Sequence, residues 1–136
     1  MTEPGAESAS LLLVDDDITF CKVLSAALER RGFAVTVAHS VEQAIPAATS
    51  NPPEFAVVDL NMGGAPGLAL VKVLQGLDQN TRIVVLTGYA SITTAVAAIK
   101  LGATQYLAKP ANADEIVAAF NRPPIVMRRS RPSPHR

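Results

Sequence analysis

The sequence predicts an α/β protein, a (βα)5 fold in which five parallel strands form one doubly wound sheet with helices on both faces. Short apolar or β-branched runs alternate five times with longer runs whose apolar residues recur at helical spacing. Units of this length join parallel strands by right-handed crossovers. The run at residues 82–87 is largely apolar, as expected for a strand covered on both sides. The 136 residues, 49% of them hydrophobic, suffice for a single core.

The first elements follow from local signals. Leu11–Val14 is a short apolar run and is the first expected strand. Residues 18–31 place apolar side chains on one helical face, and Gly32 follows, a residue favoured just past a helix end. Residues 34–38 are short and β-branched, which predicts the second strand.

The second helix is expected over residues 41–49. Ser40 is a suitable N-cap, and the helix should stop before Pro52, because a residue that precedes proline avoids helical backbone angles. Pro46 inside this span predicts a kink or a late start. The remaining elements are expected to be strand 55–59, loop 61–67, helix 68–77, strand 82–87, a helix capped by Ser91 and closed by Gly102, strand 104–108, and a short helix from Asn112 or Ala113 to about Phe120.

Polar residues stand at the predicted strand ends. Asp59 ends the third strand, and the acidic run 15–17 follows the first. Parallel strands end at one edge, where open α/β sheets bind ligands. Carboxylates there repel by about 4 kcal/mol per pair at 4 Å and an effective dielectric near 20, so a divalent cation such as Mg²⁺ is expected. A carboxylate so placed can attack phosphorus, while Thr87 and Lys109, at the next strand ends, can contact an anionic group.

Composition argues against several classes of protein. The formal charge is zero, but five of the twelve Lys and Arg residues lie in the last fifteen residues, so the body has seven bases against twelve acids. That balance is unlike the basic face of a nucleic-acid binder. The single Cys21 rules out an internal disulfide and fits a reducing cytoplasm. With no signal peptide and no run near the roughly 20 apolar residues that span a bilayer, we expect a cytoplasmic protein without a membrane partner.

Four motifs at the strand ends resemble those of a response-regulator receiver domain, which has a CheY-like, flavodoxin-like fold. The resemblance covers about residues 10–120, and four motifs in order are far more specific than any one of them. These motifs are Leu12–Asp17, Val57–Met62, Val85–Tyr89 and Tyr106–Pro110. The stretches Leu86–Val96, Lys100–Ala103, Glu29–Phe33 and Ala111–Asp114 further resemble the RegA/ActR/PrrA-type regulators of redox and photosynthesis.

The resemblance implies a phosphoacceptor switch that catalyses only its own phosphorylation and dephosphorylation. Asp59 would accept a phosphoryl group from a sensor histidine kinase. Asp16 would bind Mg²⁺ directly, Asp15 through water, and Asn61 through its backbone carbonyl. Lys109 would bridge to the phosphoryl oxygens, with a cis bond to the proline that follows it.

The same resemblance implies how a signal would spread. Thr87 would move toward the phosphate, Tyr106 would turn inward after it, and Gly88 would leave access to the site. The fourth helix, fifth strand and fifth helix would then form the surface that dimerises or holds an effector. The expected organisation is a flexible N-terminus at 1–9, a receiver domain at 10–121, and a Pro/Arg-rich linker or tail at 122–136 that is too short for an effector domain.

Several alternatives remain open at this stage. The output is either transcription, through a DNA-binding domain absent from this chain, or a phosphorelay or direct contact by a stand-alone receiver. A remote alternative is a haloacid-dehalogenase-like phosphohydrolase, because residues 15–19 fit its Asp-x-Asp-x-Thr signature, but this leaves Asp59 unexplained. Among neighbouring residues we expect Asp17 to cap a helix, Cys21 to be a buried structural thiol, and His39 to be exposed and idle.

Overall fold

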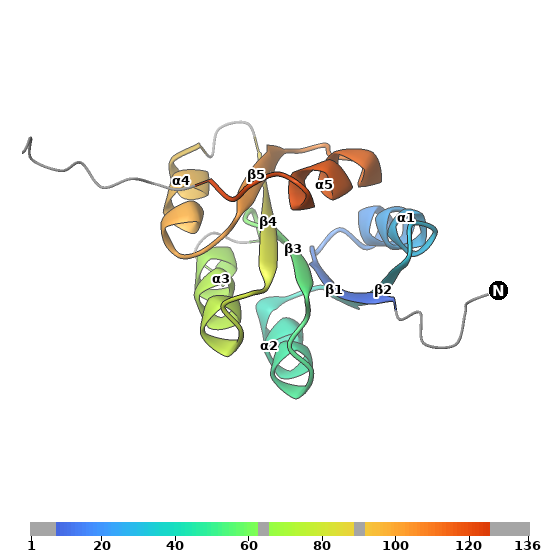
Figure 1. The fold of residues 1–136 in the computed structure, drawn as a ribbon, viewed down its shortest axis with the longest axis horizontal. Helices are drawn as coiled ribbons and strands as arrows, with labels where there is room; N and C mark the ends of the chain where they lie inside the picture. The colour runs from blue at the N-terminus through green and yellow to red at the C-terminus, as the bar shows by residue number, and fades with distance from the viewer. Residues whose placement is uncertain (1–7, 63–65, 89–91, 126–136) are drawn as a thin grey trace, which may run out of the picture.

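Five parallel strands form one sheet in the order β2-β1-β3-β4-β5, with five helices around it (Figure 1). The computed structural model describes residues 8–62, 66–88 and 92–125. The predicted (βα)5 architecture is therefore confirmed. Its elements are β1 (Ala9–Val14), α1 (Ile18–Glu29), β2 (Phe33–Ala38), α2 (Val41–Ser50), β3 (Phe55–Asp59), α3 (Pro66–Leu77), β4 (Arg82–Thr87), α4 (Ile92–Lys100), β5 (Gln105–Ala108) and α5 (Ala113–Phe120).

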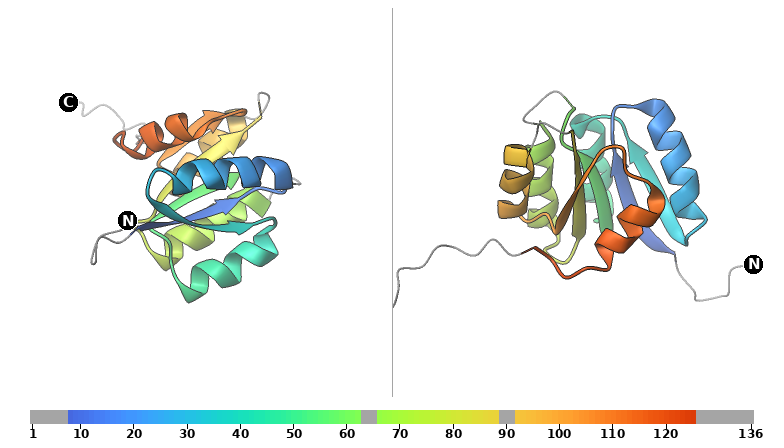
Figure 2. Two further views of the ribbon diagram at one scale, coloured as in Figure 1. Left: turned by 90° about the vertical axis from the view of Figure 1, so that its right-hand side faces the viewer. Right: turned by 90° about the horizontal axis from the view of Figure 1, so that it is seen from above.

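The helices form two layers around the sheet. Helices α1 and α5 cover one face, and α2, α3 and α4 cover the other (Figures 1 and 2). Successive strand residues point to opposite faces, so the core divides into two clusters. On β3, for example, Val57 packs on the α1/α5 side and Val58 on the α2/α3/α4 side. Burial on both faces explains why the strands are apolar runs rather than alternating ones.

Side-chain caps fix the turns that follow the strands. Asp17 Oδ1 accepts a hydrogen bond from the amide of Phe20 at 3.0 Å, as predicted for a cap of α1. Ser40 caps α2 in the same way. At the start of α5, Asn112 and Glu115 bond each other's backbone amides in a reciprocal capping box. Each such cap contributes typically about 1 kcal/mol, which holds the helix starts close to the strand ends.

Pro46 does not delay α2. The helix begins at Val41, directly after its Ser40 cap, and continues through the proline to Ser50. A proline inside a helix leaves one carbonyl of the preceding turn without an amide partner. Pro46 is exposed, so water can reach this side of the helix. The favourable cap therefore decided the start of the helix, and the expectation of a late start was wrong.

Other boundaries differ from the predictions by one or two residues. Helix α1 ends at Glu29. The amide of Arg30 still bonds the carbonyl of Ala26, but the amides of Arg31 and Gly32 bond carbonyls only three residues back, and Gly32 has a φ of +95°. Helix α3 begins at Pro66, two residues earlier than predicted, and proline is well tolerated in the first turn. The predicted Ser91 cap lies outside the described residues.

The chain after α5 lies against the amino-terminal edge of the sheet. We call residues 121–125 the exit segment. Arg82 donates to two backbone carbonyls at the end of α5 and in the exit segment, at 2.8 and 2.6 Å, and Gln105 donates to a third at 2.6 Å. The amide of Ile125 donates to the carbonyl of Thr104 at 2.9 Å. The region expected to be a tail thus begins with residues bonded to the sheet. None of the described helices is long and apolar enough to cross a membrane.

Candidate functional site

The structure brings the predicted site residues to the carboxyl edge of the sheet. Asp15 follows β1, Asp59 ends β3, Thr87 ends β4, and Lys109 follows β5. Backbone hydrogen bonds continue past the strands and tie these ends together. The amide of Lys109 donates to the carbonyl of Thr87 at 2.9 Å, and the amide of Asp15 donates to the carbonyl of Ala38 at 3.1 Å. The backbone hydrogen bonds of the sheet therefore also hold the residues that follow the strands at this edge.

Lys109 holds two buried carboxylates together. Its Nζ lies 2.9 Å from Oδ2 of Asp15 and 3.4 Å from Oδ2 of Asp59. Asp15 is fully buried and Asp59 is only 2% exposed, whereas Asp16 is exposed. One carboxylate oxygen from each of these three acids lies within 4.8 Å of the others. Two of the three acids thus share one ammonium group. The Lys109–Pro110 peptide bond is cis, as the resemblance implied.

Backbone amides bind the other oxygen of each buried carboxylate. Oδ1 of Asp15 accepts from the amide of Asp17 at 2.9 Å, and Oδ1 of Asp59 accepts from the amide of Asn61 at 2.9 Å. Both contacts join an aspartate to the amide two residues later, a common turn for this residue. The direction of both carboxylates is therefore fixed by the chain itself, with one oxygen of each toward Lys109.

Burial, hydrogen bonds and charges together raise two pKa values in the site. Burial raises the pKa of Asp59 and the nearby Asp15 charge adds to this, while the amide of Asn61 and the ammonium of Lys109 act against it. The pKa of Lys109 is also raised: burial alone would lower it, but the hydrogen bond that Lys109 donates to Asp15 and the charges of both carboxylates outweigh burial. Lys109 therefore stays protonated, and negative charge remains in excess.

The three acids fit a hard divalent cation. Carboxylate oxygens are preferred ligands of Mg²⁺ and Ca²⁺, and the exposed Asp16 leaves the cluster open to solvent. An added cation would also balance the charge that Lys109 leaves uncompensated. Within residues 8–62, 66–88 and 92–125, no other group of three or more acids, histidines or cysteines lies so close together.

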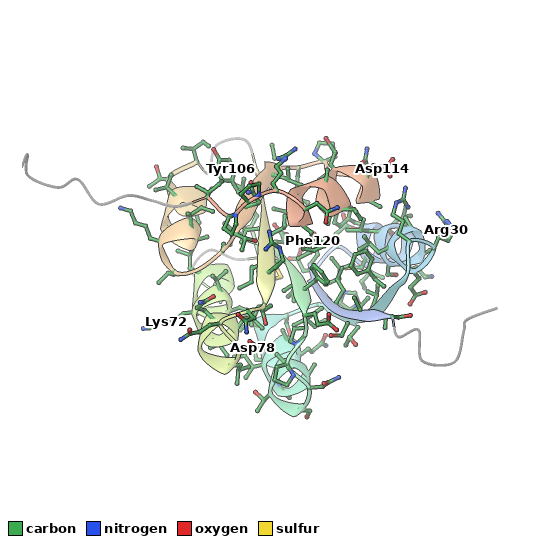
Figure 3. The ribbon with its side chains drawn as sticks, viewed as in Figure 1. Arg30, Lys72, Asp78, Tyr106, Asp114 and Phe120 are labelled. Atoms are coloured by element: carbon green, nitrogen blue, oxygen red, sulfur yellow. The ribbon has the colours of Figure 1, made fainter. Side chains whose placement is uncertain are left out.

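Thr87 and Tyr106 lie on the face of the sheet that carries α4. Tyr106 pairs with Val85, which packs on that side, and alternation places Thr87 on the same face. The buried Thr87 hydroxyl donates to the carbonyl of Gly88 at 3.0 Å. Tyr106 is half-buried between β5 and α4 (Figure 3). A Cβ added to Gly88 would lie 2.6 Å from Nδ2 of Asn61, so this glycine makes room for that side chain.

The expectation that His39 is exposed was wrong, and its side chain is not without a contact. Its ring is half-buried, and Nδ1 lies 3.0 Å from the carbonyl oxygen of Asp15. Because β2 pairs with β1 and Ala38 lies opposite Val14, the residue after β2 falls beside the residue after β1. In the sequence, the available signal was only that both residues directly follow predicted strands; the register that brings them together comes from the structure. Cys21 is buried as predicted, and its thiol donates to the same Asp15 carbonyl at 3.3 Å. Tyr89, which ends the third motif, lies outside the described residues.

A sheet of this order that gathers acids and a lysine at its carboxyl edge is typical of signalling domains that take up a phosphoryl group and are not metabolic enzymes. Residues 11–121 match the model of the response regulator receiver domain, and the chain belongs to this family. The resemblance stated from the sequence is thereby confirmed.

Two curated relatives and one solved structure show which members of the family the chain is similar to. The chain is 51% identical over 115 residues to the acid tolerance regulatory protein ActR of Sinorhizobium medicae, covering 85% of this chain and 59% of the relative. It is 52% identical over 118 residues to the photosynthetic apparatus regulatory protein RegA of Cereibacter sphaeroides, covering 87% and 64%. The chain thus spans about three fifths of the length of these relatives.

The solved structure is that of a response regulator protein from Burkholderia pseudomallei with a phosphorylated aspartic acid, a calcium ion and citrate. It superposes with a TM-score of 0.78 and 47% identity, over 84% of this chain and 67% of that chain. The similarity extends over both the fold and the sequence of the receiver domain.

Proposed function

We propose that Asp59 accepts a phosphoryl group from a sensor histidine kinase in a Mg²⁺-dependent reaction. The observation that carries this proposal is the setting of Asp59, which is buried, fixed by the amide of Asn61, and placed beside Lys109 and two further acids. The Burkholderia protein contains a phosphorylated aspartic acid and a calcium ion, which supports both parts of the proposal. The proposed receiver unit spans residues 10–121 of a cytoplasmic protein.

In the proposed transfer, a carboxylate oxygen of Asp59 attacks the phosphorus atom of a phosphohistidine. The new oxygen–phosphorus bond forms as the phosphorus–nitrogen bond breaks, and the electron pair stays on the histidine nitrogen. Lys109 already lies 3.4 Å from Asp59 and stays protonated, so it is placed to bond an oxygen of the arriving group.

Asp15, Asp16 and Asp59, with the backbone carbonyl of Asn61, are the proposed ligands of Mg²⁺. Bound there, the cation would neutralise charge on the phosphoryl oxygens. Asp16, the exposed acid, is the proposed direct ligand, and the buried Asp15, which already bonds Lys109, would contact the ion through water.

Thr87 and Tyr106 are the proposed switch residues. The Thr87 hydroxyl would leave the Gly88 carbonyl for a phosphoryl oxygen, and Tyr106, on the same face, would turn toward the space that Thr87 vacates. A group of charge about −2 can reorder a loop through new hydrogen bonds. We propose that the altered α4–β5–α5 surface dimerises, and that the output is transcription through a DNA-binding domain outside this chain. A stand-alone receiver in a phosphorelay is the alternative output.

The test is incubation with acetyl phosphate and Mg²⁺, followed by intact-mass spectrometry. The wild-type chain should gain one phosphoryl group, and reduction with borohydride should convert residue 59 to homoserine. Asp59→Asn should gain none. Asp78→Asn is the matched control, because Asp78 bonds a turn amide after α3 and lies outside the acid cluster. It should be labelled as the wild type is.

Two results would contradict the proposal. Phosphorylation of Asp59 that persists when a chelator removes divalent cations would remove its metal requirement. A label that maps to Asp15, together with steady turnover of a phosphate ester, would favour the phosphohydrolase instead.

A further inference from the structure

We propose that His39 is a positioning residue for the acids that bind Mg²⁺, an inference that rests on the proposed function. His39 follows β2 directly, and its half-buried ring reaches the end of β1. Nδ1 lies 3.0 Å from the carbonyl oxygen of Asp15. The contact therefore joins the turn after β2 to the loop that carries two of the three acids.

The chemistry of the contact defines the form of the ring. A carbonyl oxygen only accepts hydrogen bonds, so Nδ1 of His39 must carry a hydrogen. The ring also borders a cavity of about 590 Å³ that is lined by Asp16 and by residues of α2, including Ile45. His39 thus contacts the backbone on one side of the acid loop and shares a solvent-accessible space with its exposed carboxylate.

The hydrogen bond acts on the peptide between Asp15 and Asp16. Because a peptide unit is planar, the direction of the Asp15 carbonyl fixes the positions of the amide nitrogen and Cα of Asp16, from which the Asp16 carboxylate projects. The amide of Asp15 is held as well, by the carbonyl of Ala38 at 3.1 Å. The end of β2 therefore fixes both backbone groups of Asp15.

The backbone of His39 is held by a hydrogen bond of its own, separate from the contact that its ring makes. Its backbone amide donates to Oε1 of Gln43 at 2.7 Å, and Ser40 caps the helix that carries Gln43. Cys21 also donates to the Asp15 carbonyl, at 3.3 Å, but a thiol is a weak donor. The imidazole is consequently the stronger side-chain partner of this carbonyl, in the manner of groups that support metal ligands without touching the metal.

Three substitutions separate the effect of losing the hydrogen-bond donor from the effect of losing the volume of the ring. His39→Ala and His39→Leu remove the donor, and the leucine keeps an apolar volume. His39→Asn keeps an N–H at the same number of bonds from Cβ. Gln43→Ala is the matched control, because it removes one hydrogen bond of the His39 backbone and leaves the imidazole donor unaltered.

The experiment measures the dissociation constant of Mn²⁺ from the paramagnetic resonance of the free ion, with Mg²⁺ as a competitor. Loss of one hydrogen bond should weaken binding by roughly fivefold, equivalent to about 1 kcal/mol. We expect this change in His39→Ala and His39→Leu, and less than about twofold in His39→Asn and Gln43→Ala. With acetyl phosphate, His39→Ala should need more Mg²⁺ for half-maximal phosphorylation and reach the wild-type level at saturation.

A purely structural role would lower the melting temperature of His39→Ala without metal and leave the dissociation constant unchanged, which would overturn the inference. The inference would also be overturned if His39→Asn weakened Mn²⁺ binding as much as His39→Ala does. The proposed function fails separately: in that case the wild type itself would bind no Mn²⁺ or take up no phosphoryl group at Asp59.

Discussion

Replacing Asp59 with asparagine should stabilise the metal-free domain, although it removes the proposed phosphoacceptor. Asp59 is 2% exposed, and the fully buried Asp15 shares its only nearby ammonium among the described residues. Asparagine keeps the shape of the side chain and an oxygen that can accept from the amide of Asn61. Asparagine carries no charge, so the cost of burying a charged carboxylate and its repulsion from Asp15 both disappear.

Three energies decide the sign of this effect. At an effective dielectric near 20, the Asp15–Asp59 repulsion within 4.8 Å is at least about 3.5 kcal/mol. The attraction to Lys109 at 3.4 Å is about 5 kcal/mol, which leaves only about 1.5 kcal/mol in favour of the ion. Burying a carboxylate costs several kcal/mol, which exceeds this remainder. We expect a gain of about 1–3 kcal/mol in the free energy of unfolding, with roughly 3–5 °C in melting temperature per kcal/mol.

The pH dependence of the gain has a definite sign. Burial, the largest cause, raises the folded-state pKa of Asp59 above its ordinary value of 3.8. Between these two pKa values the folded state holds a proton that the unfolded state has lost, so the contribution of Asp59 to stability falls as pH rises through this window. The penalty is complete above the folded-state pKa. The advantage of asparagine should therefore be largest at neutral pH and vanish below the unfolded-state pKa.

Urea unfolding followed by circular dichroism, with a chelator present, measures this difference at neutral pH and near pH 3. Asp114→Asn is the matched control, because Asp114 is 78% exposed and bonds Arg31 at 2.6 Å. It should be neutral or slightly destabilising. Mg²⁺ should stabilise the wild type and leave Asp59→Asn nearly unchanged. The reasoning is refuted if Asp59→Asn is no more stable than the wild type at neutral pH, or if its advantage is equal at both pH values.

Two further predictions concern the exit segment and the buried thiol. Arg82→Ala removes the side chain that donates to two backbone carbonyls, so hydrogen exchange of the Ile125 amide should accelerate by at least about tenfold. Arg30→Ala, on an exposed surface, should leave this exchange rate unchanged. Equal exchange rates in both variants would contradict the role assigned to Arg82. Burial raises the pKa of Cys21 to about 11, so alkylation by iodoacetamide at neutral pH should be slow until urea unfolds the chain, and rapid reaction of the folded protein would argue against this burial.

The sequence predicted side-chain partners better than backbone partners. Asp59 and Lys109 could be brought together in advance because parallel strands end at one edge and the two residues stand at such ends. The roles of His39, Arg82 and Gln105 could not be predicted, because each side chain bonds a backbone carbonyl. The direction of a carbonyl leaves no pattern in the residue types. The error over Pro46 has a different origin: a favourable cap and an unfavourable proline competed, and only the structure shows which prevailed.

The position of Lys109 suggests how charge at the acid edge reaches the face that carries α4. Its side chain bonds Asp15 and Asp59, while its backbone amide bonds the carbonyl of Thr87 at 2.9 Å. A phosphoryl group on Asp59 would draw the ammonium away from the position that two carboxylates now hold. The same residue is tied to the end of β4, where Thr87 begins the proposed switch. The proposed change in charge and the proposed change in the α4 face would therefore meet at neighbouring atoms.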